Sequence, residues 1–169
     1  MDTLEAIHTR RSVRAYQAKP VPEELIEKLL AAAMSAPSAR NAQPWQFVVI
    51  DDRRLLAEIP RFHPNAPMTP QAAVGILVCG DLTLELSPGY WMVDCAAAVE
   101  NLLLAAHALG LGAVWTGVYP RQERMDGFRR LLGLPEHVMA HSFIPLGYPA
   151  EQPPQENRFH RDRIRRNRW

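Results

Sequence analysis

A run of nine small or apolar residues, AAVGILVCG at positions 72–80, constrains the fold of this chain more than any other segment. Valine and isoleucine favour extended backbone, and the run has the length of a strand. Side chains alternate between the two faces of a strand, so an unbroken apolar run indicates burial on both faces. We therefore predict a strand over residues 72–80 with other elements covering each of its faces.

Helical and extended patterns surround this strand in an irregular order. In the first predicted helix Leu4 and Ile7 form the apolar face, and two later helices end at Gly110 and Gly133. The predicted helices cover residues 2–9, 22–36, 54–59, 90–109 and 123–132, and the other predicted strands cover 47–50, 112–119 and 138–148. Because the strands do not alternate regularly with helices, we predict an α+β sandwich in which helices pack on a small mixed sheet.

The size and charge of the chain limit its function. Its 169 residues are 47% hydrophobic and 22% charged, which fits one globular domain. The formal net charge is +1, so any recognition of an anion must be local. The apolar stretch 91–109 is interrupted by Asp94, Glu100 and His107, which predicts a buried helix and not a membrane span. Residues 1–11 lack the signal-peptide pattern, so we expect a cytoplasmic protein without a membrane partner.

Three patterns that could carry other chemistry have simpler explanations. Cys79 and Cys95 form no CxxC pair and lie in apolar stretches, which predicts buried free thiols. The GLG at 110–112 follows a helix and precedes a strand, the reverse of a dinucleotide-binding turn. His137 and His141 would stand about 13 Å apart on a strand. No cysteine or acidic cluster joins them, so no metal site is expected.

Three arginines, Arg10, Arg11 and Arg14, surround Ser12 in the stretch HTRRSVRAY. Guanidinium groups held so close repel one another. The cluster therefore indicates either an anion bound among the arginines or a solvated arm, and its own sequence leaves both open.

A polar loop, PSARNAQPW at residues 37–45, follows the second predicted helix. Its small residues would let a ligand approach the backbone closely. Asn41 and Gln43 can each donate and accept hydrogen bonds, which matches the edge of a flat heterocycle carrying both C=O and N–H groups. A helix end followed by a polar turn explains the same residues equally well.

The most basic segment is the tail NRFHRDRIRRNRW at residues 157–169. A nucleic-acid-binding arm is the main non-enzymatic hypothesis for it. Against this hypothesis, the chain as a whole is nearly neutral, and Phe159, Ile164 and Trp169 are spaced to dock the tail on a surface. No nucleic-acid partner is therefore expected.

Taken together, four motifs resemble the FMN-dependent nitroreductase family in its short single-domain form. RRSVR, PSARNAQPW, GLGAVWTG and IPLGYP occur in this order and span nearly the whole chain. The resemblance implies one FMN-binding domain over residues 1–169, with a mostly antiparallel sheet flanked by helices. It further implies an intertwined homodimer that holds FMN at its interface, with the tail 152–169 wrapping the partner subunit.

The same resemblance assigns roles to the arginine cluster. Positions matching Arg10 and Ser12 bind the phosphate and ribityl chain, and the position matching Arg14 lies near N1 and O2 of the ring. A phosphate dianion suits a bidentate guanidinium, and a cation near N1/O2 stabilises the negative charge of reduced flavin. Arg11 is either a further cofactor contact or a solvated neighbour.

In the loop, the resemblance implies that Pro37, Ser38 and Asn41 contact the flavin of the partner protomer. Gln43 is a further candidate in the cofactor site, although with Trp45 it more directly supports the loop and the following strand.

Three positions later in the chain complete the implied cofactor site. Backbone amides at Thr116 and Gly117 would approach flavin N5, where a glycine permits close contact. Arg158 matches an arginine that reaches the phosphate. The cation often found two residues earlier in the family is replaced here by Glu156, a departure that would oppose phosphate binding by the tail.

The implied activity is hydride transfer from NAD(P)H, through flavin N5, to a small oxidised acceptor such as a nitroaromatic or a quinone, with ping-pong kinetics. No side chain needs to act as a nucleophile or as a general acid or base. Residues 63–70 and 87–90 are candidates for shaping the acceptor pocket. Reductive dehalogenation, flavin breakdown or a non-enzymatic nucleic-acid-binding role are the alternatives.

Overall fold

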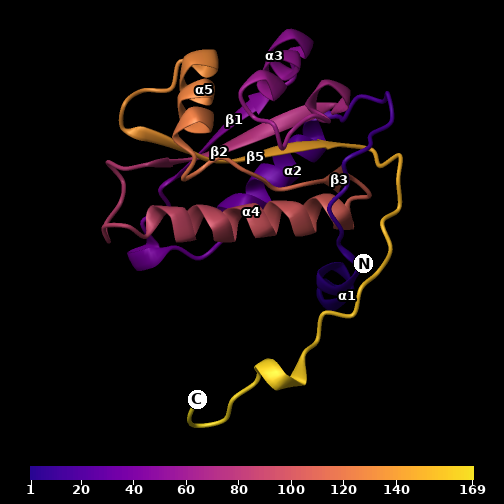
Figure 1. The fold of residues 1–169 in the computed structure, drawn as a ribbon, viewed down its shortest axis with the longest axis vertical. Coiled ribbons are helices and arrows are strands. Elements are labelled where there is room, and N and C mark those ends of the chain that lie inside the picture. The colour runs from indigo at the N-terminus through magenta and orange to yellow at the C-terminus, as the bar shows by residue number, and fades with distance from the viewer.

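The computed structural model describes residues 1–169 and contains one five-stranded sheet between two layers of helices (Figure 1). The strands are β1 (Trp45–Ile50), β2 (Val74–Asp81), β3 (Gly112–Ala113), β4 (Thr116–Gly117) and β5 (Val138–Gly147). Their order is β1-β2-β5-β3, and β4 also pairs with β5. Every strand pair is antiparallel, and the only parallel contact is an isolated bridge between Ser12 and Ala113.

The apolar run in β2 is buried on both faces, as its sequence predicts. Ile76 and Val78 belong to the core beneath one helical layer, whereas Leu77 and Cys79 belong to the core beneath the other. Leu77 lies opposite Val48 on β1 and Phe143 on β5. The alternation of the strand therefore joins two hydrophobic cores across one sheet.

Helices α2 (Glu23–Met34) and α4 (Trp91–Ala108) cover one face of the sheet. They pack along each other, and Asn101 Nδ2 donates to the carbonyl of Ala32 at 3.0 Å. After α4 the chain turns at Gly110, whose φ of +77° confirms the predicted left-handed helix end. None of the helices combines the length and the hydropathy that crossing a bilayer would need.

Helices α3 (Arg53–Glu58) and α5 (Gln122–Leu132) lie on the opposite face of the sheet (Figure 1). Leu56 from α3 and Phe128 from α5 are fully buried there. Phe128 packs on Phe143 of β5 with ring centroids 5.2 Å apart. Gly133 ends α5 with a φ of +69°, so the second predicted glycine stop is also confirmed. The α+β sandwich is therefore confirmed.

The strand predicted over residues 112–119 is wrong in one respect, because it is divided into β3 and β4. Both pieces pair with β5 in one continuous register, which places Val114 opposite Pro145. Proline has no amide hydrogen to donate, so the ladder is interrupted at this pair. The cause lies on the neighbouring strand, 31 residues away in sequence.

The ends of the chain depart from the body. Helix α1 (Thr3–Thr9) forms, but Leu4 and Ile7 are 67% and 49% exposed, so the predicted apolar face is not buried within this chain. The tail leaves the sheet and contains one short turn, η4 (Arg161–Arg163). Its apolar side chains Phe159 and Ile164 are also exposed, so docking of the tail stays a prediction.

Candidate functional site

The arginine cluster begins where α1 meets the C-terminal end of α4. Thr9 Oγ1 lies 2.7 Å from His107 Nε2 and also donates to the carbonyl of Glu5 at 2.6 Å. The Thr9 hydroxyl has one hydrogen, so it must accept from a protonated Nε2 of His107. Burial, followed by the charges of Arg10 and Arg11, lowers the pKa of His107 below its ordinary value. A neutral histidine therefore fastens the arginine cluster to α4.

Arg10 and Arg11 are adjacent in sequence but differ in how their guanidinium groups are satisfied. Arg11 Nη1 donates to the carbonyl of His8 at 3.0 Å, and its Nε donates to the carbonyl of Pro154 at 3.1 Å. Arg10 Nε is buried without a hydrogen-bond partner, and the nearest acid, Glu100, lies 3.6 Å away. Arg10 is therefore held only by a long ion pair to Glu100, whereas Arg11 ties the arm to the tail.

A pocket of about 580 Å³ lies between this arm and the tail, lined by Arg10, Arg11 and Arg158. The structure thus brings together three cations from the two ends of the chain, since Arg10 and Arg158 are 148 residues apart in sequence. Arg158 donates from Nε and Nη2 to a single oxygen of Glu156, both at 3.2 Å. Glu156, identified from the sequence as a departure, neutralises part of the charge of Arg158.

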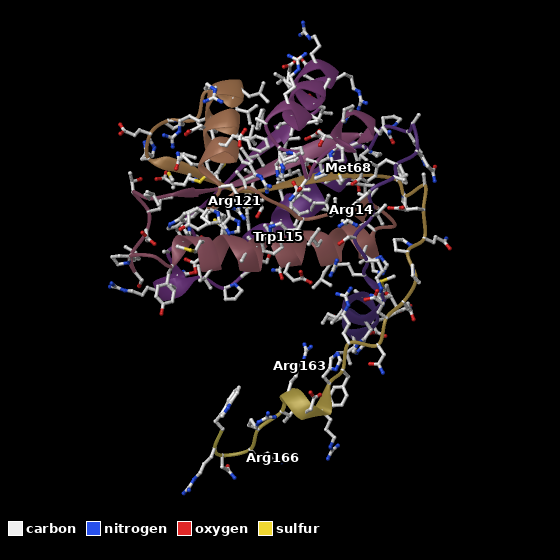
Figure 2. The ribbon with its side chains drawn as sticks, in the orientation of Figure 1. Arg14, Met68, Trp115, Arg121, Arg163 and Arg166 are labelled. Atoms are coloured by element: carbon white, nitrogen blue, oxygen red, sulfur yellow. The ribbon has the colours of Figure 1, made fainter.

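A second pocket, of about 440 Å³, lies further along the arm and is lined by Arg14, Asn65, Met68, Trp115 and Gly117, among others. Figure 2 shows Arg14, Met68 and Trp115 converging over the middle of the sheet.

The backbone holds the arm at this second pocket. The Val13 N–H donates to the carbonyl of Ala113 at 3.0 Å, which sets Ser12 beside β3. The N–H groups of Arg14 and Ala15 donate to Glu151. Of the two candidate acceptor segments, residues 63–70 contribute to this pocket, whereas residues 87–90 do not.

Gly117 lies where its backbone faces away from β5. It pairs with Ser142, while the next residue, Val118, donates to the carbonyl of His141 at 3.1 Å. Hydrogen-bonded positions alternate along an antiparallel ladder, so the N–H and C=O of Gly117 are directed away from β5. Arg124 Nη1 donates a hydrogen bond to the carbonyl of Gly117 at 2.7 Å. A Cβ at Gly117 would meet nothing within 4 Å, so the protein itself leaves room beside it.

The polar loop lies at the other end of α4. The Ala39 N–H donates to Oδ1 of buried Asp94 at 2.9 Å, in the first turn of α4. Gln43 donates from its backbone to Ser38 Oγ at 3.0 Å and from Nε2 to Asn41 Oδ1 at 2.8 Å. Gln43 thus closes the loop internally.

The backbone of this loop is also strained. Arg40, Asn41 and Gln43 have φ values of +54°, +56° and +49°. Residues other than glycine adopt such angles only where the surroundings hold them, and strain of this kind gathers at ligand sites.

The structure therefore does not bring the two sets of predicted residues together in one chain. Asp94 anchors the loop with Pro37 and Ser38, while His107 anchors the arginine arm. Thirteen residues of helix separate these anchors, or about 20 Å at 1.5 Å per residue. A ligand held by the arm cannot reach the loop of the same chain.

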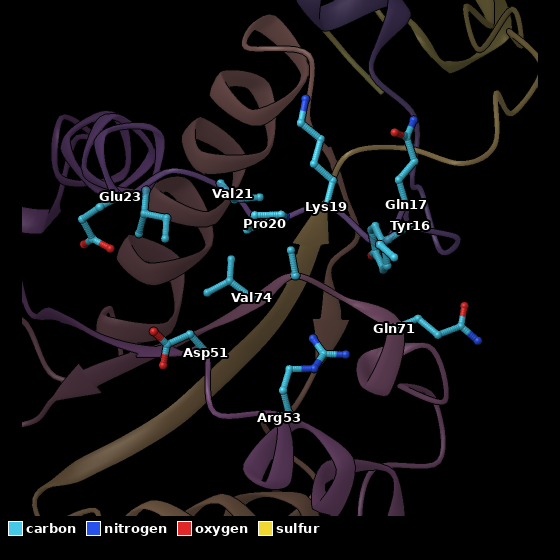
Figure 3. Close-up of a pocket in the computed structure, with 13 residues that line it drawn as sticks. Tyr16, Gln17, Lys19, Pro20, Val21, Glu23, Asp51, Arg53, Gln71 and Val74 are labelled. Atoms are coloured by element: carbon cyan, nitrogen blue, oxygen red, sulfur yellow. The ribbon is translucent and has the colours of Figure 1, made fainter.

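A third cavity, of about 670 Å³ and so larger than both of these pockets, contains none of the predicted site residues (Figure 3). Its two cations are already engaged by the protein. The side chain of Arg53 donates to the carbonyls of Pro70 and Ala72, and Lys19 Nζ lies 3.9 Å from the ring centroid of Tyr148. Size alone therefore does not locate the functional site.

The cysteines and histidines considered in the sequence analysis can also be located in the structure. Cys79 and Cys95 are buried free thiols, as predicted. His137 is exposed, whereas His141 is buried and shares a 2.8 Å hydrogen bond with Ser142. No group of three histidine, cysteine or acidic side chains is arranged to hold a metal ion.

Sequence reasoning missed two residues around the second pocket. Trp115 lines it, and Arg124 lies behind it, bonded to the carbonyl of Gly117. Asn65, which also lines the pocket, falls within the predicted acceptor segment 63–70, which the density of prolines from Pro60 to Pro70 indicated.

Comparison with known proteins places this arrangement in a family. Residues 7–148 match the model of the nitroreductase family. A protein of Methanothermobacter thermautotrophicus, named provisionally as an NADH dehydrogenase/NAD(P)H nitroreductase, is 56% identical over all of this chain and 88% of its own length.

Two solved structures have the same fold. One, a Parabacteroides distasonis protein with the same provisional name, is 44% identical, with a TM-score of 0.95 over 99% of this chain and 98% of its own. The other, a provisionally named nitroreductase of Desulfovibrio desulfuricans solved in complex with FMN, is 30% identical. Its TM-score is 0.86 over 100% of this chain and 98% of its own.

Proposed function

Because the chain belongs to the nitroreductase family, we propose that it is an FMN-dependent NAD(P)H oxidoreductase that reduces small oxidised acceptors such as nitroaromatics or quinones. The observation that carries this proposal is a pocket lined by three cations, Arg10, Arg11 and Arg158, in which the Arg10 guanidinium has only a long ion pair, 3.6 Å from Glu100. Three guanidinium groups around one pocket suit a phosphate group. When bound, FMN supplies the hydride chemistry that links NAD(P)H to an acceptor.

The residues present fit the two parts of such a cofactor. In the proposal, Arg10, Ser12 and Arg158 hold the phosphate end, and Arg11 supports them by tying the arm to the tail. Arg14 and the outward N–H of Gly117 serve the ring end, in the pocket of about 440 Å³. The side chain of Arg14 places positive charge where negative charge grows on reduction, which favours the reduced state.

The proposal includes a homodimer, because one chain cannot gather all of the predicted contacts. Pro37, Ser38 and Asn41 lie about 20 Å from the arginine arm along α4. A twofold axis beside α4 would set the loop of one protomer against the arm of the other. The outward face of α4 carries Val93, 58% exposed, with Ala97 and Leu104 following at helical spacing. Val93 is exposed and the other two are half-buried, and such incompletely buried apolar side chains support burial of this face against a partner.

In the dimer, the tail 152–169 would wrap the partner subunit. Phe159, Ile164 and Trp169 are exposed in the single chain, at 68%, 51% and 100%. Burial of three such side chains on a partner would be favourable by roughly 1.5–3 kcal/mol each before the entropy of ordering the tail is subtracted.

The first experiment is purification followed by spectroscopy and native mass spectrometry. We expect a yellow dimer that releases about one FMN per protomer, and whose flavin is bleached by NADH or NADPH without oxygen. Adding a nitroaromatic or a quinone should restore the colour. A colourless protein that takes up no added FMN would contradict the proposal.

Gly117→Ala gives a sharper version of this test. The protein has room for the added methyl group, so the variant should fold and melt like the wild type. Any loss of FMN affinity would then report close approach of the ligand to this position. Unchanged affinity would place the ring elsewhere.

A further inference from the structure

Two side chains that the proposed function does not use support the pocket wall around Gly117 from behind. Arg124, in the first turn of α5, donates from Nη1 to the carbonyl of Gly117 at 2.7 Å. His63, which follows the turn η2 (Ile59–Arg61), lies close enough to Thr116 for the backbone there to act on its pKa. Arg124 therefore bonds directly to β4, the strand that carries Gly117, and His63 lies near the same strand.

His63 is unusual among the buried side chains. It is fully buried, and neither of its ring nitrogens has a hydrogen-bond partner in the protein. The ring meets Phe128 edge-on, with centroids 6.3 Å apart. Burial, aided by the charge of Arg124, lowers its pKa to about 4, so the ring is neutral at pH 7. Each unpaired polar group costs about 1–3 kcal/mol, so packing alone does not account for a histidine here.

The two contacts fall on the two peptide groups that flank Gly117. The carbonyl of Thr116 and the N–H of Gly117 belong to one planar unit, and the carbonyl of Gly117 belongs to the next. Arg124 is bonded to the second unit, and His63, packed edge-on against Phe128, lies near the first. The bond from Arg124 therefore constrains the orientation of the peptide groups around Gly117.

This constraint matters because β4 is only two residues long. A two-residue strand has little pairing to hold its geometry, and Val114 lacks a donor opposite it at Pro145. A hydrogen-bond donor that is fixed before its ligand arrives requires no reorganisation during reaction. Supports outside the sheet can supply the rigidity that the short strand lacks.

We propose that Arg124 and His63 are positioning residues that fix the Gly117 N–H toward the ligand in this pocket. The inference rests on the proposed function, since that ligand is the flavin ring. Arg124 acts by holding the carbonyl side of Gly117, and His63 acts by packing a polar ring against Thr116. Neither side chain needs to touch the cofactor or the substrate.

Arg124→Gln tests the first half, with Arg121→Gln as its matched control. Arg121 precedes α5, carries the same charge at the same end of the helix and is exposed, without a side-chain bond to Gly117 (Figure 2). In Arg124→Gln we expect flavin reduction by NADH, measured anaerobically by stopped flow, to slow about ten- to hundredfold. Arg121→Gln should keep the wild-type rate, and Arg124→Lys should recover part of it.

A second readout needs no flavin. In FMN-free protein labelled with [15N]glycine, the nine glycine amides can be resolved, and Gly117→Ala identifies the Gly117 resonance. We expect this resonance to shift or broaden in Arg124→Gln and to stay in place in Arg121→Gln. An unmoved resonance together with a wild-type rate would overturn the role of Arg124.

His63→Phe tests the second half. Phenylalanine keeps the aromatic contact with Phe128 and removes both unpaired nitrogens, so we expect a higher melting temperature than that of the wild type. Flavin reduction should nevertheless slow, and the Gly117 amide should shift. A more stable variant with an unchanged rate and amide would overturn the role of His63. If the wild type binds no FMN, the proposed function fails, while the amide shifts still report whether these residues fix Gly117.

Discussion

The two ends of α4 hold the two halves of the candidate site in opposite ways. At the C-terminal end, Arg10 brings a charged group whose Nε makes no hydrogen bond and only a long ion pair with Glu100. At the N-terminal end, the loop around Ser38 and Asn41 pairs its polar groups internally and is anchored to buried Asp94. One end has unused hydrogen-bonding capacity, whereas the other has a fixed shape.

The difference indicates a division of labour between affinity and geometry. A cation held only by a long ion pair gains from an incoming anion, so the arginine end should govern how tightly the cofactor is held. A strained loop in which the Ser38 and Asn41 side-chain oxygens are already paired gains little from a further donor. In the proposed dimer its contribution should be a rigid surface, and its loss should appear first in stability.

The largest effect should come from breaking the anchor of the loop. Asp94→Ala removes the acceptor for the Ala39 N–H and leaves a cavity in the first turn of α4. We expect the free energy of unfolding to fall by about 3 kcal/mol, measured by urea denaturation. Asp94→Asn keeps an oxygen at the same place and should lose much less. Equal losses in both variants would show that the charge, and not the hydrogen bond, holds the loop.

The arginine end should respond in affinity instead. Arg10→Ala should weaken FMN binding by about 2 kcal/mol, or about thirtyfold in Kd, with little change in the melting temperature of the FMN-free protein. Arg11→Ala is the matched comparison, because the donors of Arg11 already serve the carbonyls of His8 and Pro154. It should lower the melting temperature more and the affinity less. The reverse ranking would refute the distinction between the two arginines.

A pH titration sharpens the same comparison at His107. Burial and the charges of Arg10 and Arg11 lower the pKa of His107, so the unfolded chain binds its proton at a higher pH than the folded chain does. Stability from the neutral ring is complete above the ordinary pKa of 6.5 and is lost as the pH falls below it. Between pH 7 and 5, unfolding free energy should therefore fall more steeply in the wild type than in His107→Gln.

Bound FMN should reduce that difference, since a phosphate near Arg10 favours the protonated ring of His107. The slopes are to be measured by denaturation at each pH, with and without FMN. Contributions from His63 and His141, whose pKa values burial lowers to about 4, are common to both proteins and cancel. Identical slopes in the two proteins would show that His107 does not sense the arginine cluster.

The smallest effect should come from the tail. Glu156→Gln releases Arg158 from its exposed ion pair, in which both groups are more than half accessible. Such pairs are worth at most about 1 kcal/mol, so FMN affinity should rise by no more than about fivefold. A fall in affinity, measured by fluorescence titration, would mean that Glu156 orients Arg158 and does not compete with the phosphate.

Much of the fold could be predicted because its signals are local. The apolar run at 72–80 indicates a strand covered on both sides, and β2 joins two cores. Glycines at 110 and 133 mark helix ends because the left-handed conformation there is intrinsic to the residue. The stretch around Arg10 and Arg14 likewise shows its charge directly in the sequence.

The remaining features depend on contacts between distant parts of the chain. The division of the third predicted strand is set by Pro145 on β5, which no reading of residues 112–119 could reveal. The contrast between Arg10 and Arg11 depends on Glu100 and Pro154, far away in sequence. For the same reason, nothing near Arg124 in the sequence indicates that its side chain reaches Gly117.

Both ends of α4 carry anchors, and this has a consequence for how the protein can change in length. Insertion of one helical turn would move the two anchors about 5 Å further apart. Insertion of a single residue would rotate one anchor by about 100° relative to the other. Residues 82–89, by contrast, form an exposed connection that holds neither anchor. We expect inserted segments to be tolerated in this connection and to destabilise the protein within Trp91–Ala108. The length of α4 should therefore be fixed, whereas the length of the connection before it can vary.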